Sequence, residues 1–189
     1  MKTLVLNGSP RVDGDSMSIV KEIVKYLNGD VVIINAYNDK ISPCTDCRYC
    51  WEHGVCSIND RMNEVYDLLD EVDNLIISSP LHYSELSGQL LSLISRFQVY
   101  YARRIIRKES DFKLKRKKGV IILTGGGDGN ISAAIDRVNI VFRQTNSELA
   151  GQVLSMNTNA IPAKEDKKAM KEAKELALLL NDLFERKSS

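Results

Sequence analysis

Apolar residues along the chain form short uninterrupted runs, separated by longer segments in which they recur at helical spacing. Runs without polar alternation predict strands of a sheet that is covered on both faces, and the spaced segments predict helices. The predicted strands span residues 4–6, 31–34, 75–78, 120–123 and 152–156. The predicted helices begin near Ser16 and then cover about 60–69, 85–101, 133–142 and 164–185.

Five strands that alternate with helices predict an α/β fold with a doubly wound parallel sheet in a three-layer sandwich, because right-handed crossovers leave few other topologies. The length of 189 residues, of which 43% are hydrophobic, suits one core. No repeat or long linker interrupts the series. We therefore expect a single domain over residues 1–189, with a cysteine-rich loop at about residues 37–59.

The charge balance points to no polyanionic partner. A net charge of +1 results from 26 basic and 25 acidic side chains, so we expect neither nucleic acid nor a membrane surface as a partner. No signal peptide follows Met1 and no run approaches the roughly 20 apolar residues of a membrane span, so we expect a cytoplasmic protein. The basic stretch 103–118 is interpreted as a solvated connection, with a phosphate or RNA patch as the alternative.

The loop after the first predicted strand combines glycines, hydroxyls and an arginine just ahead of a helix. Exposed N–H groups and the positive end of the helix dipole would face an anion there, which predicts a phosphate site. Ser9, Ser16 and Ser18 can add hydroxyl donors, and Arg11 can add a charge-assisted contact. The alternative is a plain turn in which Ser16 caps the helix. The absence of a P-loop lysine argues against ATP or GTP.

Two further loops should complete the site, because ligands of an open α/β sheet bind beyond the carboxyl ends of the strands. Residues 79–84 offer a proline, an aromatic ring and backbone groups against which a flat heteroaromatic ring could lie. A lone tyrosine such as Tyr83 is, however, more commonly a partly buried core residue. Residues 124–127 would let backbone N–H groups approach a ligand closely, because glycine has no Cβ.

Four cysteines lie within thirteen residues, at Cys44, Cys47, Cys50 and Cys56. In a reducing compartment such thiols are better read as ligands or free thiols than as disulfides. Three thiolates two residues apart can wrap one side of a [4Fe–4S] cube, and a fourth can close it from nearby. Free or redox-active thiols and a zinc site are the alternatives.

Three motifs occur in a specific order. They are Leu6-Asn7-Gly8-Ser9-Pro10-Arg11 with Gly14-Asp15-Ser16, the segment from Cys44 to Cys56 with Asp60-Arg61-Met62, and Ser79-Pro80-Leu81-His82-Tyr83 with Ser87-Gly88-Gln89-Leu90. Over residues 3 to about 127 the chain thereby resembles the NADPH-dependent FMN reductase family of flavodoxin-like folds, particularly its iron–sulfur flavoprotein branch. The resemblance implies the strand order 2-1-3-4-5.

The resemblance also implies which residues contact FMN. Its phosphate would be held by Ser9, Arg11, Ser16, Met17 and Ser18. The isoalloxazine ring would be bordered by Pro80, Leu81, His82 and Tyr83, with Thr124, Gly125, Gly126 and Gly127 along its other edge. The chain departs from the family pattern at Asp15, His82, Leu91 and Ser95. Because an acid beside a phosphate is unfavourable, Asp15 is expected to point outward or to cap the helix.

These observations predict an FMN-dependent oxidoreductase that takes electrons from NAD(P)H and passes them to a small molecule or a redox protein. The cofactor carries the chemistry, so no catalytic acid–base pair is required. The alternatives are an electron carrier without its own substrate and a nucleotide-binding regulatory protein. A flavin at an open sheet edge needs a cover, which favours a homodimer or homotetramer, and Tyr100 and Tyr101 are candidate contacts.

Overall fold

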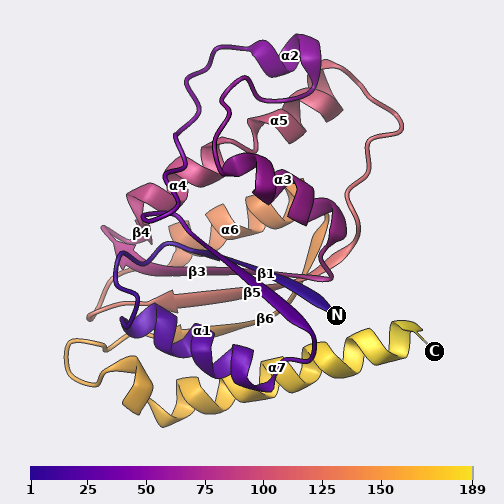
Figure 1. The fold of residues 1–189 in the computed structure, drawn as a ribbon. Helices are drawn as coiled ribbons and strands as arrows, with labels where there is room; N and C mark the ends of the chain where they lie inside the picture. Colours follow the sequence, from indigo (N-terminus) through magenta and orange to yellow (C-terminus); the bar gives the residue numbers. More distant parts are fainter. Residues whose placement is uncertain (189) are drawn as a thin grey trace.

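The computed structural model describes residues 1–188 as three layers around a parallel sheet (Figure 1). The long strands are β1 (Lys2–Asn7), β2 (Asp30–Asn35), β3 (Asn74–His82), β5 (Lys117–Thr124) and β6 (Ser147–Ser155). They lie in the order β2-β1-β3-β5-β6, and all neighbouring pairs are parallel. The predicted fold class and the order 2-1-3-4-5 of the long strands are therefore confirmed.

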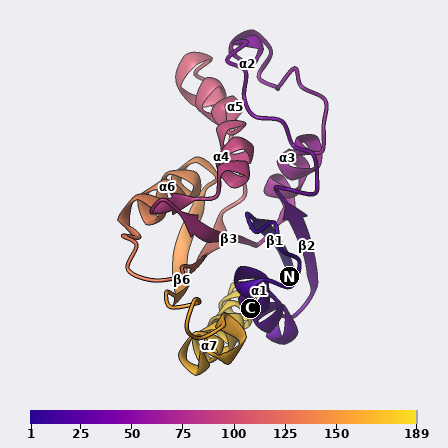
Figure 2. The ribbon, with the colours of Figure 1, turned by 90° about the vertical axis from the view of Figure 1, so that its left-hand side faces the viewer.

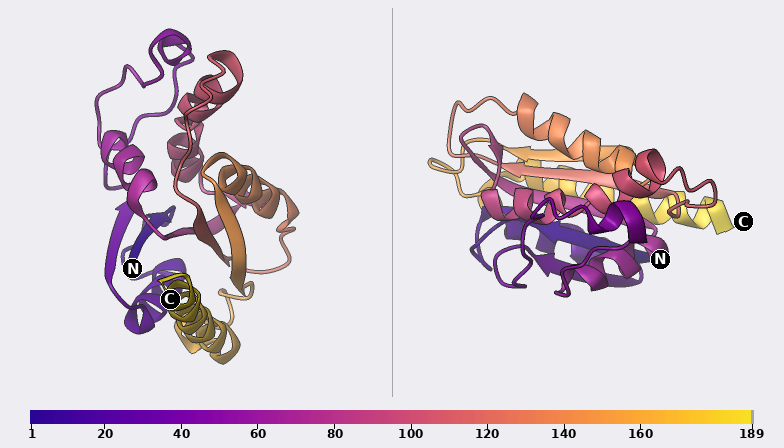
Figure 3. Two further views of the ribbon diagram at one scale, coloured as in Figure 1. Left: turned by 90° about the vertical axis from the view of Figure 1, so that its right-hand side faces the viewer. Right: turned by 90° about the horizontal axis from the view of Figure 1, so that it is seen from above.

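Helices cover both faces of the sheet (Figures 2 and 3). One face packs against α1 (Asp15–Tyr26) and α7 (Lys167–Ser188), and the other packs against α3 (Met62–Glu71), α4 (Gly88–Ser95) and α6 (Ser132–Gln144). Strand β1 shows the alternation, because Leu4 and Leu6 belong to one core cluster and Val5 to the other. Burial on both faces explains why these strands lack polar alternation.

The helix predicted over residues 85–101 is wrong in its continuity. Strand β3 continues into a short hairpin with β4 (Glu85–Leu86), in which His82 pairs with Glu85. Tyr83 and Ser84 form its two-residue turn with φ angles of 51° and 62°, and positive φ at both positions is the mark of a type I′ turn. Helix α4 therefore begins only at Gly88 and ends at Ser95. After it come α5 (Gln98–Tyr101) and the π-helix η1 (Ala102–Ile106).

Tyr100, predicted as a subunit contact, is instead a core residue. Its side chain is 3% exposed, and its ring lies 5.6 Å from both Phe97 and Phe112 between ring centroids. These aromatic contacts stabilise the buried ring. Tyr101, on the next position of the helix, is exposed and keeps its predicted role as a candidate contact.

The cysteine-bearing segment lies at one end of the molecule, beyond α3 and α4 (Figure 1). It is irregular, as predicted, except for one short helix, α2 (Tyr49–His53), which lies beside α5 and η1. A 3-10 turn, η2 (Ala163–Glu165), precedes α7 at the opposite end. Within residues 1–188, no helix combines the length and the apolar character that crossing a membrane requires.

Candidate functional site at the carboxyl edge of the sheet

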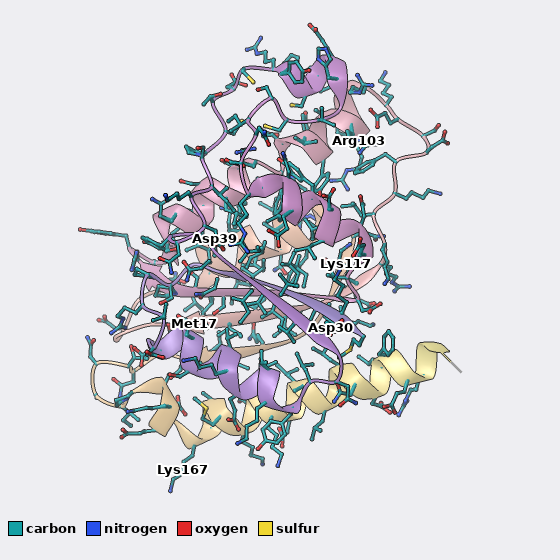
Figure 4. The ribbon with its side chains drawn as sticks, in the orientation of Figure 1. Met17, Asp30, Asp39, Arg103, Lys117 and Lys167 are labelled. Carbon is teal, nitrogen blue, oxygen red and sulfur yellow. The ribbon has the colours of Figure 1, made fainter. Side chains whose placement is uncertain are left out.

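Three loops meet where β1, β3 and β5 end. Asn7 of β1 is in register with Ser78 of β3, and Pro80 of β3 is in register with Thr124 of β5. Met17, on the first turns of α1, lies at this edge, whereas Lys117 lies at the far end of the sheet (Figure 4). The structure therefore brings the three predicted loops to one edge, as parallel strands require.

The first turn of α1 offers backbone N–H groups to an anion. Its N-cap is Gly14, which has extended backbone angles and brings no side-chain cap within the described residues. The N–H groups of a first helical turn have no acceptor inside the helix, and the helix dipole makes this end positive. The alternative in which Ser16 caps the helix is wrong, because Ser16 lies inside it.

The predicted phosphate-binding hydroxyls already make hydrogen bonds within the protein. The Ser9 Oγ accepts from the Arg11 N–H over 3.2 Å, which folds the loop on itself. The Ser16 and Thr124 hydroxyls share a hydrogen bond of 2.7 Å that joins α1 to the end of β5. Ser18 donates its hydroxyl to the Gly14 carbonyl over 3.1 Å. These bonds fix the loop around the start of α1 and leave the backbone N–H groups as the pre-arranged donors.

Asp15 does not point outward or cap its own helix. Its Oδ1 accepts a hydrogen bond from the Ala163 N–H over 2.9 Å, and its Oδ2 accepts one from Arg11 over 2.9 Å. The carboxylate thus ties the loop after β1 to η2, which accounts for an acid beside the predicted anion site. The Arg11 side chain remains largely exposed in this ion pair.

The second loop departs most from expectation. Tyr83 is 106% exposed at the tip of the hairpin, and His82 is exposed beside it. The interpretation of Tyr83 as a partly buried core residue is therefore wrong. Pro80 and Leu81, in contrast, are half-buried at the end of β3. The structure brings these two residues to the sheet edge next to Thr124 and leaves the aromatic ring projecting from the surface.

Gly8 and Ser87 form a close contact that the sequence reasoning missed. A Cβ at Gly8 would lie 2.6 Å from the Ser87 Oγ, so no side chain fits at this position. The Ser87 Oγ, the Ser78 Oγ and the Asn7 Nδ2 are buried without a hydrogen-bond partner inside the described part of the chain. Buried polar groups are normally paired, so unpaired ones at this edge fit a polar ligand or ordered water.

The third loop is held by the segment after β6. The Gly125 carbonyl accepts a hydrogen bond from the Thr158 N–H over 2.9 Å, and a Cβ at Gly126 would lie 2.6 Å from the Asn159 amide. Nothing lies within 4 Å of a Cβ built at Gly127. At Gly126 a larger residue would displace the exposed Asn159 side chain, whereas Gly127 is open to an approaching ligand.

The four thiols share one cavity of about 70 Å³. It is lined by Cys44, Cys47, Cys50 and Cys56 together with residues that include Trp51, Arg96 and Tyr101. Within residues 1–188, no three His, Cys, Asp or Glu side chains lie close enough together to hold a metal ion. Four thiols are a donor set that either an iron–sulfur cluster or zinc takes, and they would have to approach one another to hold either.

Polar contacts surround individual thiols. The Asp46 N–H donates to the Cys44 Sγ over 3.4 Å, and the Cys44 N–H donates to the Ser95 Oγ over 2.9 Å. The hydrogen bond with Ser57 lowers the pKa of the Cys47 thiol, whereas burial raises the pKa of Cys50. The two thiols therefore differ, with the pKa of Cys47 below the ordinary cysteine value and that of Cys50 above it.

Arg96 is the site residue that the sequence gave no reason to select. It follows the last residue of α4, and its side chain is fully buried in an ion pair of 2.8 Å with Asp60. Burial alone would raise the pKa of Asp60, but hydrogen bonds from Arg96 and from the Ser42 and Met62 N–H groups outweigh it and lower the pKa. On sequence alone, Arg96 reads as an ordinary polar position of an amphipathic helix.

Within residues 1–188, five of the nine basic residues in the stretch 103–118 form ion pairs with three acids. The ion pairs are Arg103 and Arg107 with Glu109, Lys115 with Asp73, and Arg116 and Lys118 with Glu148. Lys117 is not solvated as expected: it is 1% exposed and donates to the Thr145 carbonyl over 2.9 Å. Burial lowers the pKa of Lys117 to about 8.

Comparison with known proteins identifies relatives that match most of the chain. The family described as NADPH-dependent FMN reductase matches residues 1–164. The iron-sulfur flavoprotein of Methanosarcina thermophila is 26% identical over 200 residues, which cover 98% of this chain and 96% of the relative. An iron-sulfur flavoprotein of Archaeoglobus fulgidus is 27% identical over 190 residues, with 99% and 82% coverage.

Solved structures share the fold. An FMN-dependent NADH-azoreductase from Bacillus anthracis, in complex with FMN, aligns with a TM-score of 0.73 at 18% identity, covering 96% of this chain and all of that chain. The NAD(P)H:quinone oxidoreductase from Methanothermobacter marburgensis aligns with a TM-score of 0.71 at 12% identity, covering 97% and 96%. At such identities the likeness is one of fold.

The Asp60–Arg96 pair generates a prediction about acid stability. Asp60→Asn should lower the free energy of unfolding at pH 7 by about 3 kcal/mol, because it leaves a buried guanidinium uncompensated. In the wild type, the lowered pKa of Asp60 stabilises the fold above the unfolded pKa, and this stabilisation is lost as the pH falls through the folded pKa. Urea unfolding between about pH 6 and pH 3 should therefore show a weaker pH dependence for the variant. Equal pH dependence in both proteins would contradict the assignment.

Proposed function

The chain belongs to the NADPH-dependent FMN reductase family, and from this premise we propose that it is an FMN-dependent oxidoreductase. It takes electrons from NADH or NADPH and passes them to a small-molecule or protein acceptor. When bound, FMN supplies a ring that accepts a hydride from the nicotinamide and gives up the electrons to the acceptor. The task of the chain is to hold the phosphate, orient the ring and limit access of water.

The main support for the proposal is the first turn of α1, which follows its N-cap Gly14. Its backbone N–H groups suit a single terminal phosphate, as FMN has. Ser9 and Arg11 flank the same turn, and Asp15 already neutralises part of the Arg11 charge. Ser16, Met17 and Ser18 lie on that turn, and we assign this set of five residues to the phosphate, as the family pattern implies.

We assign the ring to the remaining two loops. Pro80 and Leu81 would border one edge, and Thr124 with Gly125, Gly126 and Gly127 would border the other. The buried, unpaired Asn7 Nδ2 supports a polar ligand at this edge, because it is a donor in need of an acceptor. His82 and Tyr83 are exposed in a single chain, so in our proposal they meet the ring of a neighbouring subunit or an incoming substrate.

We further propose that Cys44, Cys47, Cys50 and Cys56 hold a [4Fe–4S] cluster. Support comes from the cavity that all four thiols line and from the names of the relatives. Such a cluster supplies one-electron transfer, whereas a nicotinamide delivers two electrons as a hydride. The competing function, an electron carrier without its own substrate, differs in that neither NADH nor NADPH reduces its flavin.

The phosphate assignment predicts how the chain tells FMN from riboflavin, which has the same ring and no phosphate. The wild type should bind FMN much more tightly. In the Ser9→Ala/Arg11→Ala double variant, FMN affinity should fall at least about tenfold, because charge-assisted hydrogen bonds are lost, while riboflavin affinity stays unchanged. Fluorescence quenching titrations measure both. Lys21→Ala is the matched control, because Lys21 lies on α1 but pairs with Asp13 at the surface. Unchanged FMN affinity in the double variant would refute the assignment.

The cluster assignment predicts about four iron and four acid-labile sulfide per chain after anaerobic reconstitution. Cys50→Ser should hold much less iron and keep its FMN, because the thiol cavity and the carboxyl edge are built from different residues. Gln98→Ala is the control, since Gln98 lines the same cavity and the change removes no thiol. Full flavin with no iron in the reconstituted wild type would refute the cluster and leave the FMN assignment intact.

We expect a homodimer or homotetramer, because the exposed Tyr83 and Tyr101 are large aromatic surfaces of the kind favoured at interfaces. Light scattering at micromolar concentration should give at least twice the monomer mass of 21.2 kDa. Tyr101→Arg should shift the distribution towards the monomer. A monomeric wild type would refute this expectation.

A further inference from the structure

Arg96 is a fully buried cation in which one of the three guanidinium nitrogens, Nε, makes no hydrogen bond within residues 1–188. The residue is 1% exposed, and its two terminal nitrogens make three hydrogen bonds. Nη1 donates to the Ser42 carbonyl over 3.0 Å and to the Asp60 carboxylate over 2.8 Å, and Nη2 donates to the Ile58 carbonyl over 3.0 Å. The Nε is buried without a partner in residues 1–188.

The three acceptors bracket the cysteine segment. Ser42 lies two residues before the first thiol, and Ile58 and Asp60 lie two and four residues after the last. A single guanidinium therefore holds both ends of the segment together at the end of α4. Its neighbour Ser95 adds a further tie, because its Oγ accepts the hydrogen bond from the Cys44 N–H.

The same arginine lines the cavity that the four thiols share. A cluster held by four thiolates carries net negative charge, and its potential depends on that charge, on hydrogen bonds to sulfur and on burial. A buried positive charge stabilises the more negative, reduced form. The Arg96 side chain is fully buried, so its positive charge lies behind the lining of the cavity, and its Nε–H has no acceptor in residues 1–188.

We propose that Arg96 is a positioning residue for the cluster: it clamps the two ends of the cysteine segment and holds a buried positive charge beside the cavity of the four thiols. The inference rests on the proposed function, because it needs the cluster in this cavity. The clamp itself exists in the protein without the cluster. The two parts of the inference can therefore be measured separately.

Three variants separate clamp from charge. Arg96→Gln removes both, and Arg96→Lys keeps the charge but cannot reach three acceptors from one planar group. Arg61→Gln is the matched control, because Arg61 lies in the same sequence motif, pairs with Asp39 and Glu64 at the surface and is outside the cavity wall. All three are compared with the wild type for flavin content, which reports whether the fold is intact.

The first measurement is limited tryptic cleavage after Arg48 in the cluster-free protein. Arg48 is exposed in the middle of the segment, so cleavage there reports how often the segment opens. Both Arg96 variants should be cut about tenfold faster than the wild type, because three hydrogen bonds are lost, and Arg61→Gln should be cut at the wild-type rate. Wild-type cleavage rates in both Arg96 variants would overturn the clamp.

The second measurement is the midpoint potential of the reconstituted cluster, followed by its electron paramagnetic resonance signal. Arg96→Gln should have a lower potential than the wild type, or bind little iron, while Arg96→Lys and Arg61→Gln stay near the wild type in potential. A wild-type potential in Arg96→Gln would overturn the role of the charge. If Arg96→Gln does not fold, Arg96→Lys still decides the clamp, and an unchanged cleavage rate in it alone overturns the proposal. A wild type that takes up no iron refutes the cluster, while the cleavage assay still decides the clamp.

Discussion

A buried guanidinium imposes a strict requirement on the chain around it, because an uncompensated charge in a protein interior costs several kcal/mol. Arg96 meets this requirement with oxygens from Ser42, Ile58 and Asp60. Ser42 precedes the first cysteine, and Ile58 and Asp60 follow the last. The cysteine segment therefore begins and ends beside Arg96, at the end of α4. This contact holds both ends of the cysteine segment, which lies at the top of the molecule in Figure 1.

Helix α4 connects this arrangement to the sheet edge. At its start, Ser87 packs against Gly8 so closely that no side chain fits there, and its N–H donates to the Ser79 hydroxyl over 3.0 Å. At its end, Ser95 and Arg96 hold the cysteine segment. A helix of eight residues spans only about 12 Å, so the predicted flavin edge and the cysteine segment are joined through one short helix. Such a connection suits a protein in which two redox groups exchange electrons.

The fold could be predicted from local patterns because each long strand carries an apolar run that both faces of the sheet bury. The ends of the strands could not be predicted from these patterns. In the sequence Ser79 and Pro80 resemble a turn, but β3 continues through them because they pair with β5. The site loops were found from glycine and hydroxyl composition. The burial of Arg96 and Tyr100 could not be predicted, because it depends on partners elsewhere in the sequence. Examples are Ser42 for Arg96 and Phe112 for Tyr100.

One anaerobic absorption titration decides whether NAD(P)H reduces a flavin in this protein. Protein purified without oxygen is scanned before and after addition of one equivalent of NADPH or NADH, and then after dithionite. We expect flavin bands on a broad iron–sulfur absorption. The nicotinamide should bleach the flavin bands, and an electron acceptor should restore them. Flavin bands that stay unchanged with both nicotinamides but bleach with dithionite would contradict an NAD(P)H-dependent oxidoreductase and favour an electron carrier.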